Sequence, residues 1–183
     1  MSFIQTIKSY NPTFWVVNFL QIIERGAWFG VFSLLGLYLV ASTDEGGLGL
    51  SHIQKGNILA NVTAIQFFLP LFFGVIADRI GYKLSLIIAF VIIGVGYYLM
   101  GTVDSYWAIY LAFLFAAMGG SFFKPVASGI IARTTDEKTS TMGFGLFYLM
   151  ANIGGFFGPA FSSYLRTTMG WRIIFLQGAA MIL

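Results

Sequence analysis

The sequence predicts an all-α membrane protein whose apolar helices pack as one bundle, and three observations favour this fold class. Charged residues make up 9% of the 183 residues, whereas soluble domains average about 25%. The mean hydropathy of the chain is +0.84. Apolar runs recur at short spacing, and several are long enough for a transmembrane helix, which needs about 20 residues. Helices satisfy their own backbone polar groups, so they are the structure expected for such runs in lipid.

The first expected helix, about 12–40, follows from one long apolar stretch. Asp44, Glu45 and the sequence GGLG at 46–49 mark a loop after it. The second helix, 52–77, ends at a charged turn that contains glycine. The next three helices follow from apolar runs separated by short loops, and they cover 82–102, 106–132 and 141–165.

The sixth expected helix covers 171–183, and this run has too few residues to cross a bilayer. We therefore expect residues 1–183 to be the N-terminal transmembrane half of a larger protein, truncated in helix 6, with the C-terminal half absent. The lipid bilayer and that missing half are then expected partners.

Three charged residues lie inside apolar runs: Glu24 and Arg25 side by side in the first, and Lys124 in the fourth. A charge at bilayer depth costs roughly 3 kcal/mol on insertion scales, so such residues are rare and usually functional. We therefore predict that the three form a functional charge cluster. The alternative is a purely structural ion pair with Lys124.

Polar side chains recur three or four residues apart on several expected helices, which places them on common faces. This pattern predicts a bundle around a polar cavity. Some polar residues in membrane helices only form interhelical hydrogen bonds, worth about 1 kcal/mol or less, and we favour that role for Asn57, Asn61, Ser121 and Ser128. The faces comprise Asn18, Gln21, Arg25 and Trp28 on the first helix, Asn57 and Asn61 on the second, Ser121, Lys124 and Ser128 on the fourth, and Tyr148, Asn152 and Gly155 on the fifth.

The composition excludes several classes of function. The chain has no cysteine and one histidine, His52, so disulfides, thiolate metal sites and cysteine nucleophiles are excluded. We expect no metal and no cofactor. A phosphate loop of the form G-x-x-x-x-G-K is absent, which argues against ATP-driven transport, and we expect no Ser–His catalytic arrangement and therefore no enzyme. A net charge of +3 carried by scattered residues does not suggest a nucleic-acid partner.

The distribution of lysine and arginine favours one orientation by the positive-inside rule. Five basic residues at the ends of the expected helices share a side with the N-terminus, and three lie on the other side: Lys55, Arg166 and Arg172. We therefore expect a multi-pass protein of the cell's inner (plasma) membrane with a cytoplasmic N-terminus.

The turn between the second and third expected helices reads GVIADRIGYK at 74–83. It resembles the G-x-x-x-D-R-x-G-x-K signature of the major facilitator superfamily, carried here by Gly74, Asp78, Arg79, Gly81 and Lys83. In physical terms, Gly74 permits close helix approach, Gly81 permits a tight turn, and Asp78 can face a helix N-terminus. The resemblance implies a gating loop that holds the two halves of a transporter together on the cytoplasmic side.

Three further segments resemble the proton-dependent oligopeptide transporter family. They are QIIERGAWFG at 21–30, GGSFFKP at 119–125 and FYLMANIGGFFGP at 147–159. The match is specific because all three occur in order, each on the expected helix. The resemblance implies two inverted three-helix repeats in each half, with the substrate site at the membrane midplane between two halves.

The family resemblance also implies roles for individual residues. Glu24, Arg25 and Lys124 correspond to a switchable charge network in which protonation breaks a salt bridge. The expected substrate cavity contains Gln21, Trp28, Phe29, Tyr148 and Asn152. Close packing or helix bending is implied for Gly154, Gly155, Gly158 and Pro159.

The sequence departs from the family pattern at two places. Gln21 stands where the family carries an acid, and an amide cannot titrate. Val31 and Phe32 occupy the place where many peptide-transporting members carry a basic residue. With Trp28 and Phe29, Phe32 would make a more aromatic wall, which suits a larger or less charged solute.

The function expected from these observations is secondary active transport, as proton-coupled symport of di- and tripeptides or a related small solute by alternating access. Protons and a peptide-like solute are then the expected partners. The alternatives are a pH-independent facilitator or a drug-type proton antiporter of the same fold, or a non-transporting membrane solute sensor. The antiporter alternative is suggested by the glycines and proline at 154–159.

Overall fold

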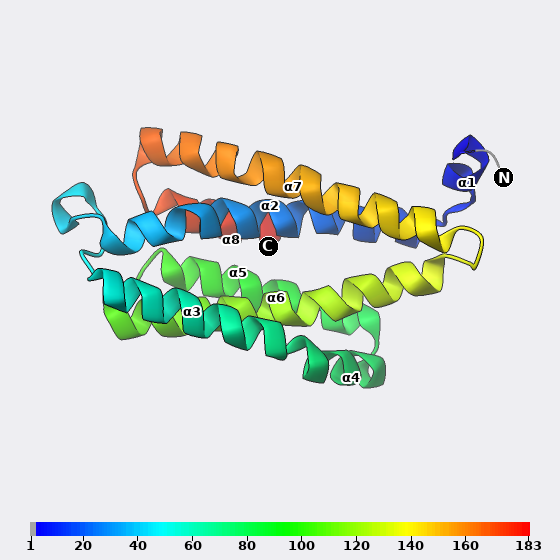
Figure 1. The fold of residues 1–183 in the computed structure, drawn as a ribbon, viewed down its shortest axis with the longest axis horizontal. Coiled ribbons are helices and arrows are strands. Elements are labelled where there is room, and N and C mark those ends of the chain that lie inside the picture. The colour runs from blue at the N-terminus through cyan, green and yellow to red at the C-terminus, as the bar shows by residue number, and fades with distance from the viewer. Residues whose placement is uncertain (1–2) are drawn as a thin grey trace.

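The computed structural model describes residues 3–183, and this part of the chain is helical with short connections and contains no strand (Figure 1). The fold is therefore all-α, as predicted. Its elements are α1 (Phe3–Ser9), α2 (Pro12–Val40), a 3-10 turn η1 (Thr43–Glu45), α3 (His52–Phe68), α4 (Pro70–Ile80), α5 (Tyr82–Met100), α6 (Tyr106–Thr134), α7 (Ser140–Met169) and α8 (Ile173–Ile182).

Four of these helices, α2, α5, α6 and α7, are each long and apolar enough to cross a bilayer. Their starts have local causes. The Asn11 side chain accepts from the backbone N–H of Phe14 while Pro12 opens α2, and Ser105 caps α6 in the same way. α7 ends at Met169, four residues further than expected, and Gly170 is its C-cap.

The sequence predicts one helix over 52–77, but the structure has two, α3 and α4, bent by 45° at Leu69. Pro70 is the cause of the break. Proline has no backbone N–H to donate to the carbonyl four residues earlier, and its ring crowds the preceding turn. The bent pair is together long enough to count as one broken span.

The helices form a single bundle in which α2 packs mainly against α7, and α5 mainly against α6 (Figure 1). α8 contacts both α5 and α2, so it joins the two pairs. The broken α3–α4 pair lies along α6. This arrangement places one face of α2 towards α6 and α7, and the two charged residues of α2, Glu24 and Arg25, lie on that face.

A seam of small residues explains the extensive contact between α2 and α7. A Cβ atom at Gly158 would collide with the backbone of Gly26, and one at Gly154 would lie 2.9 Å from the backbone nitrogen of Gly26. Gly30 faces Ser162 in the same way. Small residues allow membrane helices to approach closely and gain dispersion contacts. Gly154 and Gly158 both lie in this seam.

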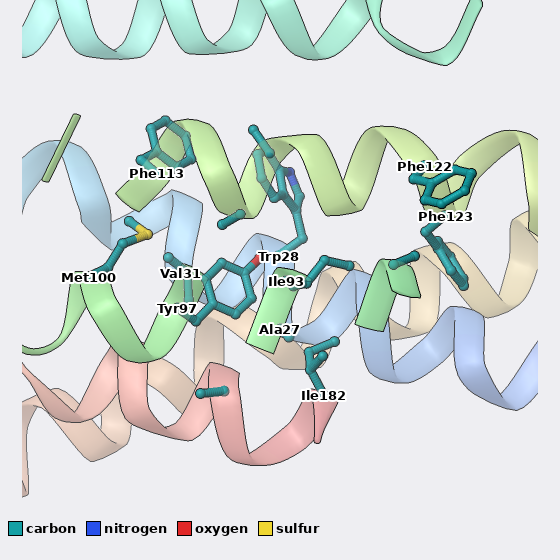
Figure 2. Packing of buried hydrophobic residues seen from close by; sticks show 14 of the residues in the cluster. Ala27, Trp28, Val31, Ile93, Tyr97, Met100, Phe113, Phe122, Phe123 and Ile182 are labelled. Atoms are coloured by element: carbon teal, nitrogen blue, oxygen red, sulfur yellow. The ribbon is translucent and has the colours of Figure 1, made fainter. Parts of the chain in front are cut away.

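Large apolar side chains fill the centre of the bundle between α2, α5, α6 and α8 (Figure 2). The ring of Trp28 stacks on Phe32 at 5.3 Å and on Phe113 at 6.0 Å between centroids. By contrast, large aromatic side chains such as Phe156 and Phe157 on α7 are exposed. Apolar side chains on the outside and inside alike are expected of helices in lipid.

Candidate solute cavity and charge cluster

A cavity of about 470 Å³ lies between α2, α4, α6 and α7. Its lining combines aromatic rings, two cationic side chains and neutral polar groups, which is a typical composition for a binding site. The lining residues are Gln21, Arg25, Phe29, Pro70, Lys124, Pro125, Ser128, Phe147, Tyr148, Ala151 and Asn152.

Glu24 lies behind Arg25, and its side chain is 1% exposed against 12% for Arg25. The guanidinium donates from Nε and Nη2 to the two carboxylate oxygens, each at 2.5 Å. Adjacent helical residues do not normally face each other, so the length of the arginine side chain makes this two-point contact possible. Both charges are compensated within the pair, which is the condition for burying them.

Lys124 is half-buried on α6, and its ammonium lies 5.3 Å from the centroid of the Phe67 ring. Among residues 3–183, Lys124 has no carboxylate within ion-pair distance. The structural Glu24–Lys124 ion pair considered as the alternative is therefore not made in this conformation. A lysine over an aromatic face retains only a weak attraction, so its ammonium can take an anionic partner from the cavity.

Of the five residues expected to line the substrate cavity, Gln21, Phe29, Tyr148 and Asn152 do so. Trp28 does not. Although it shares a helical face with Arg25 by spacing, it is 8% exposed and stacks within the apolar core. The expected aromatic wall of Trp28, Phe29 and Phe32 is thus represented in the cavity by Phe29, with Phe147 and Tyr148 from α7.

The structure adds residues that sequence reasoning did not assign to the cavity. Phe147 lies in the same motif as Tyr148, and Ser128 lies one turn from Lys124, so both had a signal in the spacing. Pro70 reaches the cavity because of the break between α3 and α4, which the hydropathy pattern does not reveal. The Ser128 hydroxyl donates to the carbonyl of Pro125 within α6 at 3.1 Å, rather than to another helix.

The other polar residues lie in three different environments. The Ser121 hydroxyl does make the expected interhelical hydrogen bond, to the backbone carbonyl of Gln66 at 3.1 Å. Asn57 and Asn61 instead lie exposed on α3. Asn18 is buried, and its amide donates to the carbonyl of Phe14 at 2.8 Å, one turn earlier in α2.

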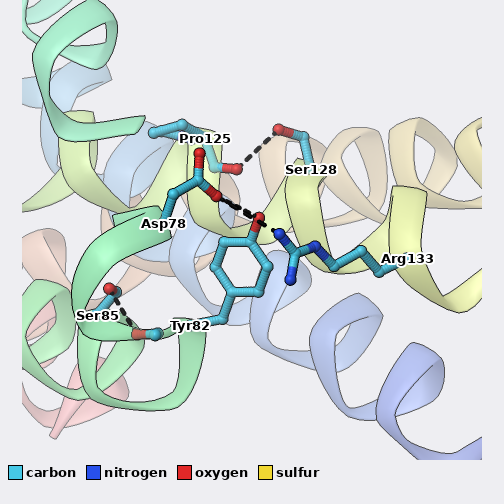
Figure 3. A network of polar contacts seen from close by, with 7 residues as sticks. Asp78, Tyr82, Ser85, Pro125, Ser128 and Arg133 are labelled. Carbon is cyan, nitrogen blue, oxygen red and sulfur yellow. Dashed lines mark hydrogen bonds and ion pairs between the residues drawn. The ribbon is translucent and has the colours of Figure 1, made fainter. Parts of the chain in front are cut away.

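The turn at 74–83 holds a separate polar network between α4, α5 and α6 (Figure 3). The Tyr82 hydroxyl donates to Asp78 at 2.9 Å, and Arg133 lies 3.7 Å from the same carboxylate and over the Tyr82 ring. Gly81, at the turn between α4 and α5, has φ +88°, which only glycine adopts readily.

The remaining residues of that turn have looser surroundings. A Cβ atom at Gly74 would lie 3.7 Å from the Cβ of Pro125, an ordinary contact, so close approach does not demand glycine there in this conformation. Arg79 and Lys83 are exposed.

In the loop between α6 and α7, the pKa of Asp136 is held below its ordinary value by hydrogen bonds from the Thr139 hydroxyl and from the backbone N–H groups of Thr139 and Lys138.

A family model described as the Major Facilitator Superfamily matches residues 17–183. The chain belongs to the major facilitator superfamily. This superfamily consists of transporters rather than enzymes, as expected.

Two curated relatives of this superfamily member are peptide transporters. Dipeptide and tripeptide permease A of Klebsiella pneumoniae (strain 342) is 24% identical over 166 residues, which is 88% of this chain and 32% of that protein. Peptide transporter YePEPT of Yersinia enterocolitica is 27% identical over 159 residues, 83% of this chain and 31% of that protein. The resemblance to the oligopeptide transporter family is therefore confirmed, and the chain spans about a third of the length of these relatives.

Solved structures share the fold. A peptide transporter POT in complex with sulfate superposes with a TM-score of 0.86 at 21% identity, over 93% of this chain and 35% of that one. A POT family transporter in complex with 5-aminolevulinic acid gives 0.86 at 22% identity, over 97% and 39%. The fold is that of the N-terminal helical bundle of a major facilitator superfamily transporter.

Proposed function

We propose that this chain supplies the N-terminal half of a proton-coupled symporter that moves di- and tripeptides, or a related small solute, by alternating access. The observation that carries the proposal is the buried Glu24–Arg25 pair at the wall of a cavity that also receives Lys124. The named peptide permeases among the relatives support the solute class. A C-terminal half would close the cavity from the other side.

In this proposal, the Glu24–Arg25 pair couples proton binding to solute binding because both events change how the charge of Arg25 is compensated. While Glu24 is ionised it occupies Arg25 at both oxygens. When a proton adds to the Glu24 carboxylate, the guanidinium loses its partner and is left as an uncompensated buried cation, which is unfavourable by several kcal/mol. A solute carboxylate entering the cavity restores that compensation. Protonation of Glu24 and binding of the solute thus favour each other.

The other lining groups suit a short peptide. Lys124 offers a second cation for the solute carboxylate, and the amides of Gln21 and Asn152 can donate to or accept from peptide groups. Phe29, Phe147 and Tyr148 supply apolar surface for side chains. This division into a few oriented polar groups and an aromatic wall is typical of small-molecule sites.

The proposal extends to the setting of the protein. We place it in the inner (plasma) membrane with a cytoplasmic N-terminus, so that the 74–83 turn faces the cytoplasm. There the Asp78, Tyr82 and Arg133 network would hold α4, α5 and α6 together while the cavity is closed on that side.

The test is uptake by the full-length protein reconstituted in vesicles with an imposed pH gradient. We expect uptake of di- or tripeptides to follow the gradient, and Glu24→Gln to abolish the gradient dependence. Glu45→Gln is the matched control, because Glu45 is an exposed glutamate in the 3-10 turn. Uptake that ignores the gradient, or that Glu24→Gln leaves unchanged, contradicts the proposal.

Gln21 favours a second candidate, a pH-independent facilitator. It lines the cavity next to Arg25, and no aspartate or glutamate is among the cavity-lining residues in the described part of the chain. Counterflow of labelled peptide without a gradient, compared with gradient-driven uptake, separates the two candidates. A facilitator exchanges solute equally well with and without the gradient, whereas a symporter accumulates solute only with it.

A further inference from the structure

Gln66 is a buried polar side chain that the proposed mechanism leaves unused. It lies near the C-terminal end of α3 and is 3% exposed. Its amide nitrogen Nε2 has no hydrogen-bond partner among residues 3–183. A buried donor without a partner costs about 1–3 kcal/mol, so an amide in this position calls for an explanation.

The backbone of Gln66 is fixed in place by α6. In a continuous helix its carbonyl would accept from the N–H of residue 70, but that residue is Pro70, which has none. The Ser121 hydroxyl donates to this carbonyl instead, at 3.1 Å, and also to the carbonyl of Ala117 at 2.8 Å. Ser121 is fully buried. The break before α4 and this serine together hold Gln66 against α6.

Gly120 determines what the Gln66 side chain faces. A Cβ atom at this glycine would lie 3.4 Å from Nε2 of Gln66 and 3.7 Å from Oε1 of Glu24. The unpartnered amide and the carboxylate therefore border the same space, which exists because residue 120 has no side chain. Oε1 is also the oxygen that accepts from Nη2 of Arg25.

We propose that Gln66 is a positioning residue for Glu24: its Nε2 donates a hydrogen bond to the Glu24 carboxyl group once Arg25 has left it. The inference rests on the proposed function, in which the solute takes over Arg25. Both forms of the carboxyl group have an oxygen that accepts from an amide, so Gln66 serves the released side chain before and after it gains a proton. Without Gln66, the carboxyl group that Arg25 has released would be buried with no hydrogen-bond donor on the side of α3.

A buried hydroxyl from another helix also has to be considered. Tyr97 of α5 is 1% exposed and carries an O–H donor within the same bundle. Tyr97→Phe therefore belongs in the experiment as the rival to Gln66. Lys124 and Arg25 are the cations on the cavity side.

The test is infrared difference spectroscopy of the full-length protein in lipid vesicles, titrated from alkaline to acidic pH. The carbonyl band of protonated Glu24 is identified by its loss in Glu24→Gln. We expect Gln66→Met, which keeps the length of the side chain, to shift this band to higher frequency because the carbonyl loses a donor. Gly120→Ala should shift it likewise, since its methyl group separates the two side chains. Gly56→Ala is the control, because a Cβ there contacts nothing within 4 Å.

Peptide uptake gives a second measurement. Gln66→Met should lower the maximal rate about fivefold, as expected for the loss of one hydrogen bond, and should leave KM nearly unchanged, because Gln66 acts on Glu24 and not on the solute. A band that stays in place in Gln66→Met, or that moves only in Tyr97→Phe, overturns the inference while leaving symport intact. Absence of gradient-driven uptake in the unmodified protein overturns the proposed function instead, and the infrared titration still decides the role of Gln66.

Discussion

The Glu24–Arg25 pair and the Asp78–Arg133 pair join the same kinds of side chain in opposite environments. In the first pair the acid is 1% and the arginine 12% exposed, and the contact is made at two points. In the second the side chains are 62% and 68% exposed and lie 3.7 Å apart. Breaking a buried pair leaves a charge that water cannot compensate, whereas an exposed pair contributes about 1 kcal/mol or less.

This difference indicates what each pair can do. The exposed contacts of Asp78, Tyr82 and Arg133 can form and break with little change in free energy. This property suits a contact between helices that move apart during a transport cycle. The buried pair can part only when another anion replaces Glu24 or when Glu24 is neutralised. In the proposed symporter, burial would therefore make this ion pair a coupling element.

The largest expected effect on stability comes from removing one partner of the buried Glu24–Arg25 pair. Glu24→Gln leaves the Arg25 guanidinium uncompensated and should lower the free energy of unfolding by about 3 kcal/mol. The double variant Glu24→Gln with Arg25→Met should recover much of this loss, because it removes the isolated charge. Thermal unfolding of the full-length protein in detergent measures both. Equal stability of the single and double variants would show that water in the cavity compensates Arg25.

A smaller effect should follow from displacing α2, which holds the buried pair, without touching a charge. Gly158→Ala places a methyl group against the backbone of Gly26, so α2 and α7 must separate, at about 1–3 kcal/mol. Gly145→Ala, on the same helix, is the control, because a Cβ there contacts nothing within 4 Å. Unfolding in detergent gives the two stabilities. If both variants are equally stable, the small-residue seam does not fix the position of α2.

Much of the fold and of the candidate site could be predicted from the sequence, because these features depend on patterns of residues close together in the chain. The all-α class, the charge cluster and the glycine turn at Gly81 follow from hydropathy, from the cost of intramembrane charge and from backbone geometry. Trp28 shows the limit. Its spacing places it on the face of Arg25, but a helical face is wide, and the packing of Phe113 from α6 decides that the ring is buried in the core.

The break at Pro70 and the role of Gln66 show a second limit. The hydropathy pattern continues through Phe68, Leu69 and Pro70, so the run indicates one helix, although proline carries the local signal for a break. That the Ser121 hydroxyl replaces the missing donor could not be predicted, because it requires knowing that α3 packs against α6 at that level.

The smallest expected effect concerns an exposed pair at the other end of the bundle, where one guanidinium nitrogen of Arg172 donates to both oxygens of Asp104, at 2.8 and 3.0 Å. This geometry is better than that of Asp78 and Arg133, yet Arg172 and Asp104 are 56% and 65% exposed. If burial rather than geometry decides the contribution, Asp104→Asn should lower the free energy of unfolding by only about 0.5 kcal/mol. The difference should vanish in concentrated salt, which screens exposed charges. Unfolding of Asp104→Asn and of the control Asp44→Asn, an exposed loop residue, should be compared at low and high salt. A loss comparable to that of Glu24→Gln, insensitive to salt, would show that geometry governs these pairs and that burial does not set the energetic contribution of the Glu24–Arg25 pair.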